Sequence, residues 1–239
     1  WRVPRRPAAV SMLASWRGPA ARAEPGLGVG SGKRSMDAAQ DSRMSPPRRR
    51  PGLLQRPALD AHFARLLDCR LLLVCAPAGY GKTSALLLAH EYLLAAERRV
   101  AWLSLDEGDR DLGRFADSFL RALRRAGAPA APEPARRLGG EVALPPTVVR
   151  TTLMNELVLL SDELFVLLDD YHLVDAEDVQ SLINGVLLSP THALRFVIAS
   201  RTPNALPLGR LRALGQVEEI EAADLTFSES EVARFVTGI

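Results

Sequence analysis

Hydrophobic and polar residues follow two different patterns along this chain of 239 residues. Residues 1–52 show no sustained periodicity, are rich in Arg, Pro, Ala, Gly and Ser, and end with the run Ser45-Pro-Pro-Arg-Arg-Arg-Pro51. Such a segment cannot bury enough apolar surface to offset the entropy that ordering would cost. The pattern therefore predicts a disordered basic tail over residues 1–52 and a folded domain over residues 53–239.

In the folded part, short apolar runs alternate with segments of helical spacing. The apolar runs predict strands at residues 70–76, 99–105, 164–169, 194–200 and 216–221. Helical spacing predicts helices at residues 59–68, 83–96, 111–125, 147–160 and 177–188, and Ser228-x-x-Glu231 is a capping box that opens a last helix. The stretch Gly127–Pro146 is predicted to be a loop or insertion. Strands alternating with helices indicate an α/β fold with a parallel sheet covered by helices on both faces.

Charge divides the chain at the same place. The net charge is +2, and residues 1–58 hold twelve Lys/Arg against three Asp/Glu, so they carry +9 and residues 59–239 carry −7. A mildly acidic domain argues against a nucleic-acid groove on it, because phosphate binding needs clustered cations. Residues 1–23, with five Arg and no acid, also fit a targeting peptide, but the chain starts at Trp1 and Met36 or Met44 fits a start codon as well. A solvated tail or translated upstream sequence is the preferred interpretation.

Two further features favour a cytoplasmic protein without a membrane partner. Cys69 and Cys75 flank or enter one apolar run, and a strand would hold them too far apart to form a disulfide, so both are predicted to be reduced. No apolar stretch approaches the roughly 20 residues that a membrane helix needs.

A phosphate-binding motif follows the first predicted strand directly. Gly, four residues and Gly-Lys-Ser/Thr define the P-loop, and this chain matches it with Ala in place of the first Gly. The predicted nucleotide-binding residues are Ala76, Pro77, Ala78, Gly79, Tyr80, Gly81, Lys82, Thr83 and Ser84. A plain Gly-rich turn is the alternative, and the strand before the motif and the helix after it argue against that alternative.

The residue types of the motif match the chemistry of a nucleoside triphosphate. Gly79 and Gly81 can adopt positive φ, so that successive backbone N–H groups point inward and cradle the β-phosphate. The helix N-terminus adds its positive dipole, Lys82 reaches the β/γ-phosphates, and the Thr83 hydroxyl ligates Mg²⁺. Of 30 Lys/Arg residues only two are lysines. The second one, Lys33, lies in Gly30-Ser31-Gly32-Lys33, which lacks the Ser/Thr and a preceding strand and is interpreted as a decoy.

The other candidate residues end two predicted strands. In a P-loop protein the first Asp after such a strand holds the metal, so Asp169 is assigned to Mg²⁺ and Asp170 to the attacking water. A mere cap of the strand-to-helix loop is the alternative. Arg201 follows the next strand at the carboxyl edge of the sheet, where ligands bind in open α/β folds, and is the candidate sensor of the γ-phosphate. A solvated arginine is the competing interpretation, and His172 either supports the acidic pair or is structural.

Together these motifs resemble a known family. Ala76–Thr83, Val100–Asp109, Leu167–Leu173 and Ala199–Pro203 are similar to the ATPase module of the large MalT-like, LuxR-type transcriptional regulators, which are STAND-type P-loop NTPases. The resemblance covers roughly residues 53–239, and Ala76 in place of Gly is usual in the family. It implies a slow ATPase that acts as a regulatory switch, binds ATP or ADP and self-associates in the full-length protein. It also implies that DNA is bound only through a C-terminal domain absent from this chain.

Three other classes compete with this interpretation. A small-molecule kinase also uses a P-loop, but it needs an Arg-rich lid, and Gly127–Pro146 offers only Arg136 and Arg137. A transporter ATPase would carry a Leu-Ser-Gly-Gly-type signature, which the sequence lacks. A binding module with a decayed site is disfavoured because Lys82, Thr83 and the acidic pair are intact.

Overall fold

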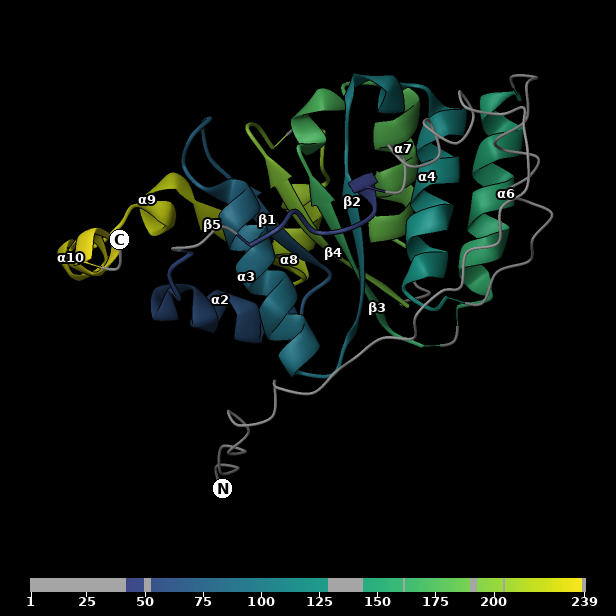
Figure 1. Cartoon of the computed structure of the whole chain (residues 1–239). Helices are drawn as coiled ribbons and strands as arrows, with labels where there is room; N and C mark the ends of the chain where they lie inside the picture. Colours follow the sequence, from purple (N-terminus) through teal and green to yellow (C-terminus); the bar gives the residue numbers. More distant parts are fainter. Residues whose placement is uncertain are drawn as a thin grey trace, which may run out of the picture.

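The domain is built around one five-stranded sheet, in which every pair of neighbouring strands is parallel (Figure 1). The computed structural model describes residues 42–49, 53–128, 144–160, 162–189, 193–203 and 205–237. The strands are β1 (Leu71–Cys75), β2 (Arg99–Ser104), β3 (Leu164–Asp169), β4 (Leu194–Ser200) and β5 (Val217–Glu221), and their order across the sheet is β2-β3-β4-β1-β5. This is the predicted α/β P-loop NTPase fold.

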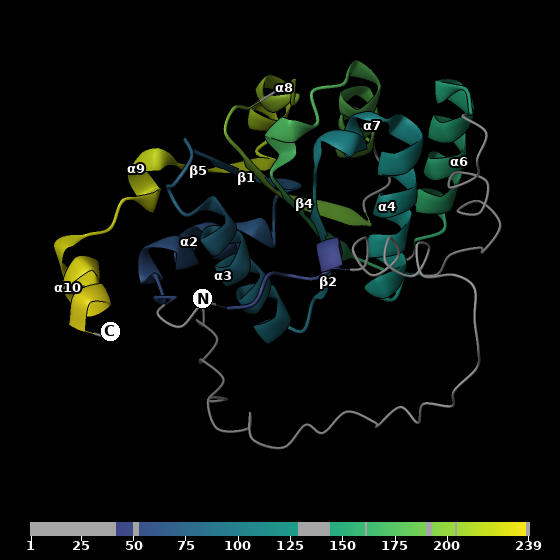
Figure 2. The same cartoon turned by 45° about the horizontal axis from the view of Figure 1, so that its top comes forward.

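Helices cover both faces of the sheet, as Figures 1 and 2 show. The helices of the described residues are α2 (Pro57–Leu66), α3 (Lys82–Ala95), α4 (Leu112–Arg125), α6 (Pro146–Val158), α7 (Glu177–Leu187), α8 (Leu208–Ala213), α9 (Ala222–Leu225) and α10 (Glu229–Thr237), with short 3₁₀ turns η1 (Glu107–Arg110) and η2 (Tyr171–Leu173). One face carries α4, α6 and α7, and the other carries α2 and α3.

Strand alternation explains why the sheet must be covered twice. In β1, Leu71 and Leu73 face the cluster under α4 and α7, whereas Leu72 and Val74 face the cluster under α2 and α3, and all four are buried. Successive side chains of a strand point to opposite faces, so a strand that is apolar at every position can only be satisfied between two layers.

The sequence pattern located the long elements well. The predicted strands at residues 164–169 and 194–200 have the observed bounds, and the predicted helices shift by one or two residues at their ends. Two short helices, α8 and α9, were not predicted, because six and four residues are too few to display a helical period. Most of the predicted loop Gly127–Pro146 lies outside the described residues.

Part of the predicted disordered tail is instead folded onto the domain. Residues 42–49, which we call the strap, carry Met44 with 6% of its surface exposed, inside the core cluster of α4. The expectation of disorder is therefore wrong for these eight residues, because one buried apolar side chain and its charged neighbour Arg43 supply contacts that average composition does not reveal. The rest of the predicted tail, and the decoy Lys33 with it, lies outside the described residues.

Two smaller expectations can be compared with the structure. Cys69 and Cys75 are both free thiols, as predicted. None of the helices among the described residues has the length and apolar character needed to span a bilayer.

Candidate functional site

The P-loop joins the end of β1 to the start of α3 with the expected backbone geometry. Gly79 has φ +85° and Gly81 has φ +82°, the left-handed region that glycine tolerates best. Helix α3 begins at Lys82, so its N-terminus points into the loop. Because the first N–H groups of a helix have no intrahelical partner, the loop and the helix together present donors for an anion.

Lys82 lies folded back into the loop that it serves. Its Nζ donates a hydrogen bond to the Pro77 carbonyl oxygen at 2.9 Å, and the residue is 8% exposed. Burial lowers the pKa of Lys82, and the nearby Arg201 lowers it further, while Asp170 and Asp169 act in the opposite direction. A phosphate group beside this partly desolvated ammonium would add a favourable opposite charge.

Asp169, the last residue of β3, contacts the P-loop residue Thr83. The Thr83 hydroxyl donates to its Oδ1 at 3.2 Å, and the backbone N–H of Asp170 donates to the same oxygen at 3.1 Å. Burial raises the pKa of Asp169 to about 6, and the adjacent Asp170 carboxylate contributes to the increase. A hydroxyl and a buried carboxylate in contact are oxygen ligands of the type that Mg²⁺ prefers.

Asp170, which follows the last residue of β3, has a different environment. It leaves β3 with φ 57° and ψ 37°, a left-handed conformation that a non-glycine residue adopts at some energetic cost. This turn brings its half-exposed side chain to the cavity wall, whereas Asp169 stays buried against Thr83. The two carboxylates are therefore not equivalent.

The strand order explains how Arg201 comes to this site. Strand β4 lies between β1 and β3, so its end stands between the P-loop and the acidic pair. Arg201 follows β4 directly, is exposed, and lines the same cavity as Lys82 and Asp170. The sequence-predicted candidates from the three strand ends thus meet at one edge of the sheet.

This edge opens into a cavity of about 940 Å³. Segments far apart in the sequence form its other walls: Pro47 and Arg48 of the strap, Leu53, Leu54 and Arg56 before α2, and Leu225, Thr226, Phe227 and Phe235 around α9 and α10. Sequence reasoning missed this apolar part, because no local pattern indicates where such distant segments meet. An apolar chamber beside a phosphate cradle has the character of a base-binding pocket.

Arg56 holds two of these walls together. Its guanidinium donates to the carbonyl oxygens of Leu225 at 2.8 Å and Thr226 at 2.9 Å, and its Nε pairs with Glu231 at 3.0 Å. It also lies 5.0 Å from the centre of the Phe227 ring, within the range of a cation–π contact. The segment before α2 is thereby fixed to α9 and α10.

His172 lies behind the acidic pair. Its Nδ1 is 3.9 Å from Asp170 Oδ1, and neither ring nitrogen makes a hydrogen bond to the residues that the structure describes. Burial and the nearby Arg201 lower its pKa. The arrangement fits a neutral imidazole that packs against Asp170.

Curated proteins share this chain's sequence over most of its length. HTH-type transcriptional regulator MalT of Cronobacter sakazakii is 30% identical over 196 residues, covering 81% of this chain and 21% of that protein. MalT of Klebsiella pneumoniae is 29% identical over 205 residues with the same coverage. Serine/threonine-protein kinase PknK of Mycobacterium tuberculosis is 32% identical over 170 residues, covering 69% of this chain and 15% of that protein. The predicted resemblance to MalT-like regulators is confirmed, and the chain spans about a fifth or less of these relatives' length.

No protein-family model matches the chain. Among solved structures, the Drosophila ORC bound to GC-rich DNA and Cdc6 has a TM-score of 0.45 at 12% identity, covering 87% of this chain and 66% of that one. AMPPCP-bound DnaA from Aquifex aeolicus has a TM-score of 0.36 at 13% identity, covering 82% and 48%. TM-scores below 0.5 carry no functional argument, and the fold class follows from the parallel sheet and the P-loop described above.

Proposed function

Since the chain is a P-loop NTPase module homologous to a segment of MalT-type regulators, we propose that it binds ATP with Mg²⁺, hydrolyses it slowly and acts as a regulatory switch. The observation that carries this proposal is the contact of Thr83 with Asp169, 3.2 Å apart, beside the buried Lys82. This contact supports a site in which the proposed phosphate cradle, the proposed Mg²⁺ ligands and the Lys82 ammonium lie together.

Each residue of the loop has a binding role in this proposal. The backbone N–H groups of residues 76–84 hold the phosphates, with Gly79 and Gly81 giving the loop its curvature. Lys82 exchanges the Pro77 carbonyl for a phosphate oxygen, whose negative charge offsets the cost of burying the ammonium. Thr83 and Asp169 would hold Mg²⁺, whose charge neutralises the β- and γ-phosphates when it is bound.

Hydrolysis requires a group that orients water and a cation that stabilises charge on the γ-phosphate. We propose Asp170 for the first role, a proposal supported by its position in the cavity wall. We propose Arg201 for the second, because it follows β4 and lines the same cavity. We assign both residues catalytic roles.

A phosphotransferase is the competing function. The name of PknK refers to a protein of which this chain covers 15%, so it does not assign kinase activity to the shared segment. The printed sequence contains neither His-Arg-Asp nor Asp-Phe-Gly, the motifs that carry the catalytic and metal-binding Asp of protein kinases. A small-molecule kinase remains the alternative to be tested.

The partners proposed for the parent protein follow from its relatives. MalT is named an HTH-type transcriptional regulator. We therefore propose that the parent protein binds DNA through residues outside this chain. Self-association in the ATP-bound state and a cytoplasmic location belong to the same proposal.

A phosphate-release assay separates the two functions. The switch releases phosphate from MgATP at a low rate that is unchanged by added small-molecule acceptors, whereas a kinase forms a phosphorylated acceptor and releases little phosphate. Asp170→Asn should keep nucleotide affinity and lose turnover by roughly 100-fold or more, the usual effect of removing a positioned base. Acceptor-dependent consumption of ATP would overturn the switch, and full turnover by Asp170→Asn would overturn the role of that residue.

A further inference from the structure

The strap, residues 42–49, lies across the domain from the carboxyl end of β2 towards α3 (Figures 1 and 2). Near its start, the Arg43 Nε donates to the Ser104 carbonyl oxygen at 2.9 Å, and Met44 enters the core. At its other end, Arg49 forms an ion pair with Glu91 of α3 at 3.2 Å. The segment is therefore fixed at two places about six residues apart.

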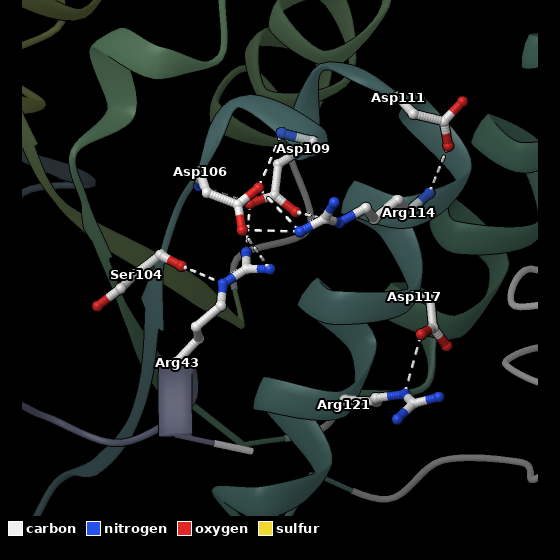
Figure 3. A network of polar contacts seen from close by, with 9 residues as sticks. Arg43, Ser104, Asp106, Asp109, Asp111, Arg114, Asp117 and Arg121 are labelled. Atoms are coloured by element: carbon white, nitrogen blue, oxygen red, sulfur yellow. Dashed lines mark hydrogen bonds and ion pairs between the residues drawn. The ribbon is translucent and has the colours of Figure 1, made fainter. Parts of the chain in front are cut away.

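The stronger anchor is a cluster of charged side chains that follows β2 (Figure 3). Arg43 pairs with Asp106 at 3.0 Å and also with Asp109, and Arg114 pairs with Asp106 at 2.7 Å. Asp109 is completely buried, and burial raises its pKa, while Arg43 and Arg114 counteract that increase. A buried carboxylate of this kind requires its cations, so the cluster holds Arg43 firmly.

Within this cluster the Arg114 guanidinium lies directly over Gly108. A Cβ at Gly108 would lie 1.7 Å from Arg114 Nη1, so only glycine lets the guanidinium occupy its position. The cluster also adjoins the acidic strand, because Leu105 N–H donates to the Asp169 carbonyl oxygen at 3.0 Å. The anchor of the strap and the candidate metal ligand are thus linked through one stretch of backbone.

Between its two anchors the strap contributes to the nucleotide cavity. Pro47 and Arg48 line that cavity together with the P-loop, Lys82 and Arg201. Arg48 is exposed, and no ion-pair partner for it is found among the residues that the structure describes. A guanidinium at the rim of a cavity that already holds two cations favours an anionic occupant.

We propose that Arg43 is a positioning residue for the nucleotide pocket: it holds the strap in the place where Pro47 and Arg48 complete the pocket wall. This inference rests on the proposed binding of ATP at the P-loop. Arg43 itself does not line the cavity, so its effect on the ligand passes through the strap. If loss of the anchor leaves the strap in place only about a fifth of the time, the apparent Kd for nucleotide rises about fivefold.

The test compares Arg43→Met with a matched control, Arg121→Met. Arg121 also forms an arginine–aspartate pair, 2.9 Å from Asp117, but both residues lie on α4 and neither lines the cavity (Figure 3). MgATP affinity is measured by isothermal titration calorimetry. We expect a rise in Kd of about fivefold or more for Arg43→Met and less than twofold for Arg121→Met. Equal affinities of wild type and Arg43→Met would overturn the inference.

Two further measurements separate positioning from loss of stability. In Arg43→Met/Asp109→Asn no buried carboxylate loses its cation, so the melting temperature should recover relative to Arg43→Met while nucleotide affinity stays low. Trypsin cleavage after Arg48 and Arg49, followed by mass spectrometry without nucleotide, should be faster in both variants than in wild type. Recovery of affinity together with stability, or unchanged cleavage, would overturn the inference. If the wild type binds no nucleotide, the proposed function itself is wrong. If the wild type and Arg43→Met bind nucleotide equally well, only the role of Arg43 is wrong.

Discussion

Asp169→Asn is expected to stabilise the nucleotide-free protein while removing the carboxylate proposed to bind Mg²⁺. Burial raises the pKa of this carboxyl to about 6 from an ordinary value of 3.8. Because the folded pKa is the higher one, the contribution of protonated Asp169 to stability is complete below about pH 4 and is lost as the pH rises through 6. Above that range the buried carboxylate lowers the free energy of unfolding by roughly 3 kcal/mol.

Asparagine avoids this cost with little change in shape. Its amide oxygen can still accept the hydrogen bonds from the Thr83 hydroxyl and the Asp170 N–H that the carboxylate accepts now. For a domain of this size, 3 kcal/mol corresponds to a rise in melting temperature of about 6–12 °C. The gain should be seen at pH 8 and should disappear near pH 4.

Thermal unfolding followed by circular dichroism, with EDTA and without nucleotide, measures this difference. The matched control is Asp162→Asn, an exposed carboxylate that pairs with Arg99 at 2.9 Å and should change stability by less than about 1 kcal/mol at either pH. A lower melting temperature for Asp169→Asn at pH 8, or a gain of equal size at both pH values, would refute the reasoning.

Three other predictions follow from the same geometry. The preference for MgATP over free ATP should fall by up to tenfold per pH unit below about pH 6, because protons compete with the metal for Asp169. Nucleotide titrations with and without Mg²⁺ at pH 5 and pH 7 measure this preference. Deletion of residues 1–41 should leave the melting temperature unchanged. Deletion of residues 1–50 should lower the melting temperature by several degrees, because it also removes Arg43 and Met44 and their buried contacts. Scanning calorimetry of the two deletion variants tests this difference. In a gel-shift assay the chain should bind DNA only weakly and without sequence preference, with binding lost between about 50 and 200 mM salt, because only the basic residues 1–58 offer counterion release. DNA fragments of different sequence should therefore bind equally well at every salt concentration.

The features that the sequence predicted are those with a local physical cause. Strand β3 is a continuous apolar run, and a run apolar at every position fits only a strand buried on both faces. The capping box of α10 is present as predicted, since Ser228 N–H donates to Glu231 Oε2 at 2.9 Å and Glu231 N–H donates to Ser228 Oγ at 3.3 Å. The P-loop was predictable because all of its chemistry lies within nine consecutive residues.

The features that the sequence did not predict depend on contacts between distant segments. Arg56 meets Glu231 at a separation of 175 residues, and Arg43 meets Asp109 at a separation of 66. Each of these arginines looks like an ordinary surface charge in its local sequence. Met44 shows the limit of compositional reasoning, because one apolar side chain in a polar segment can be buried without creating any periodic pattern.

Equilibrium titration of the wild-type chain, Lys82→Ala and Lys33→Ala with MgATP tests the central claim most directly. A charge-assisted phosphate contact is worth about 1.5–3 kcal/mol, so loss of the Lys82 ammonium should weaken binding by tenfold or more. Lys33→Ala removes the only other lysine of the chain and should bind MgATP like the wild type. Unchanged affinity in Lys82→Ala, or an equal loss in both variants, would contradict the assignment of the nucleotide to the P-loop.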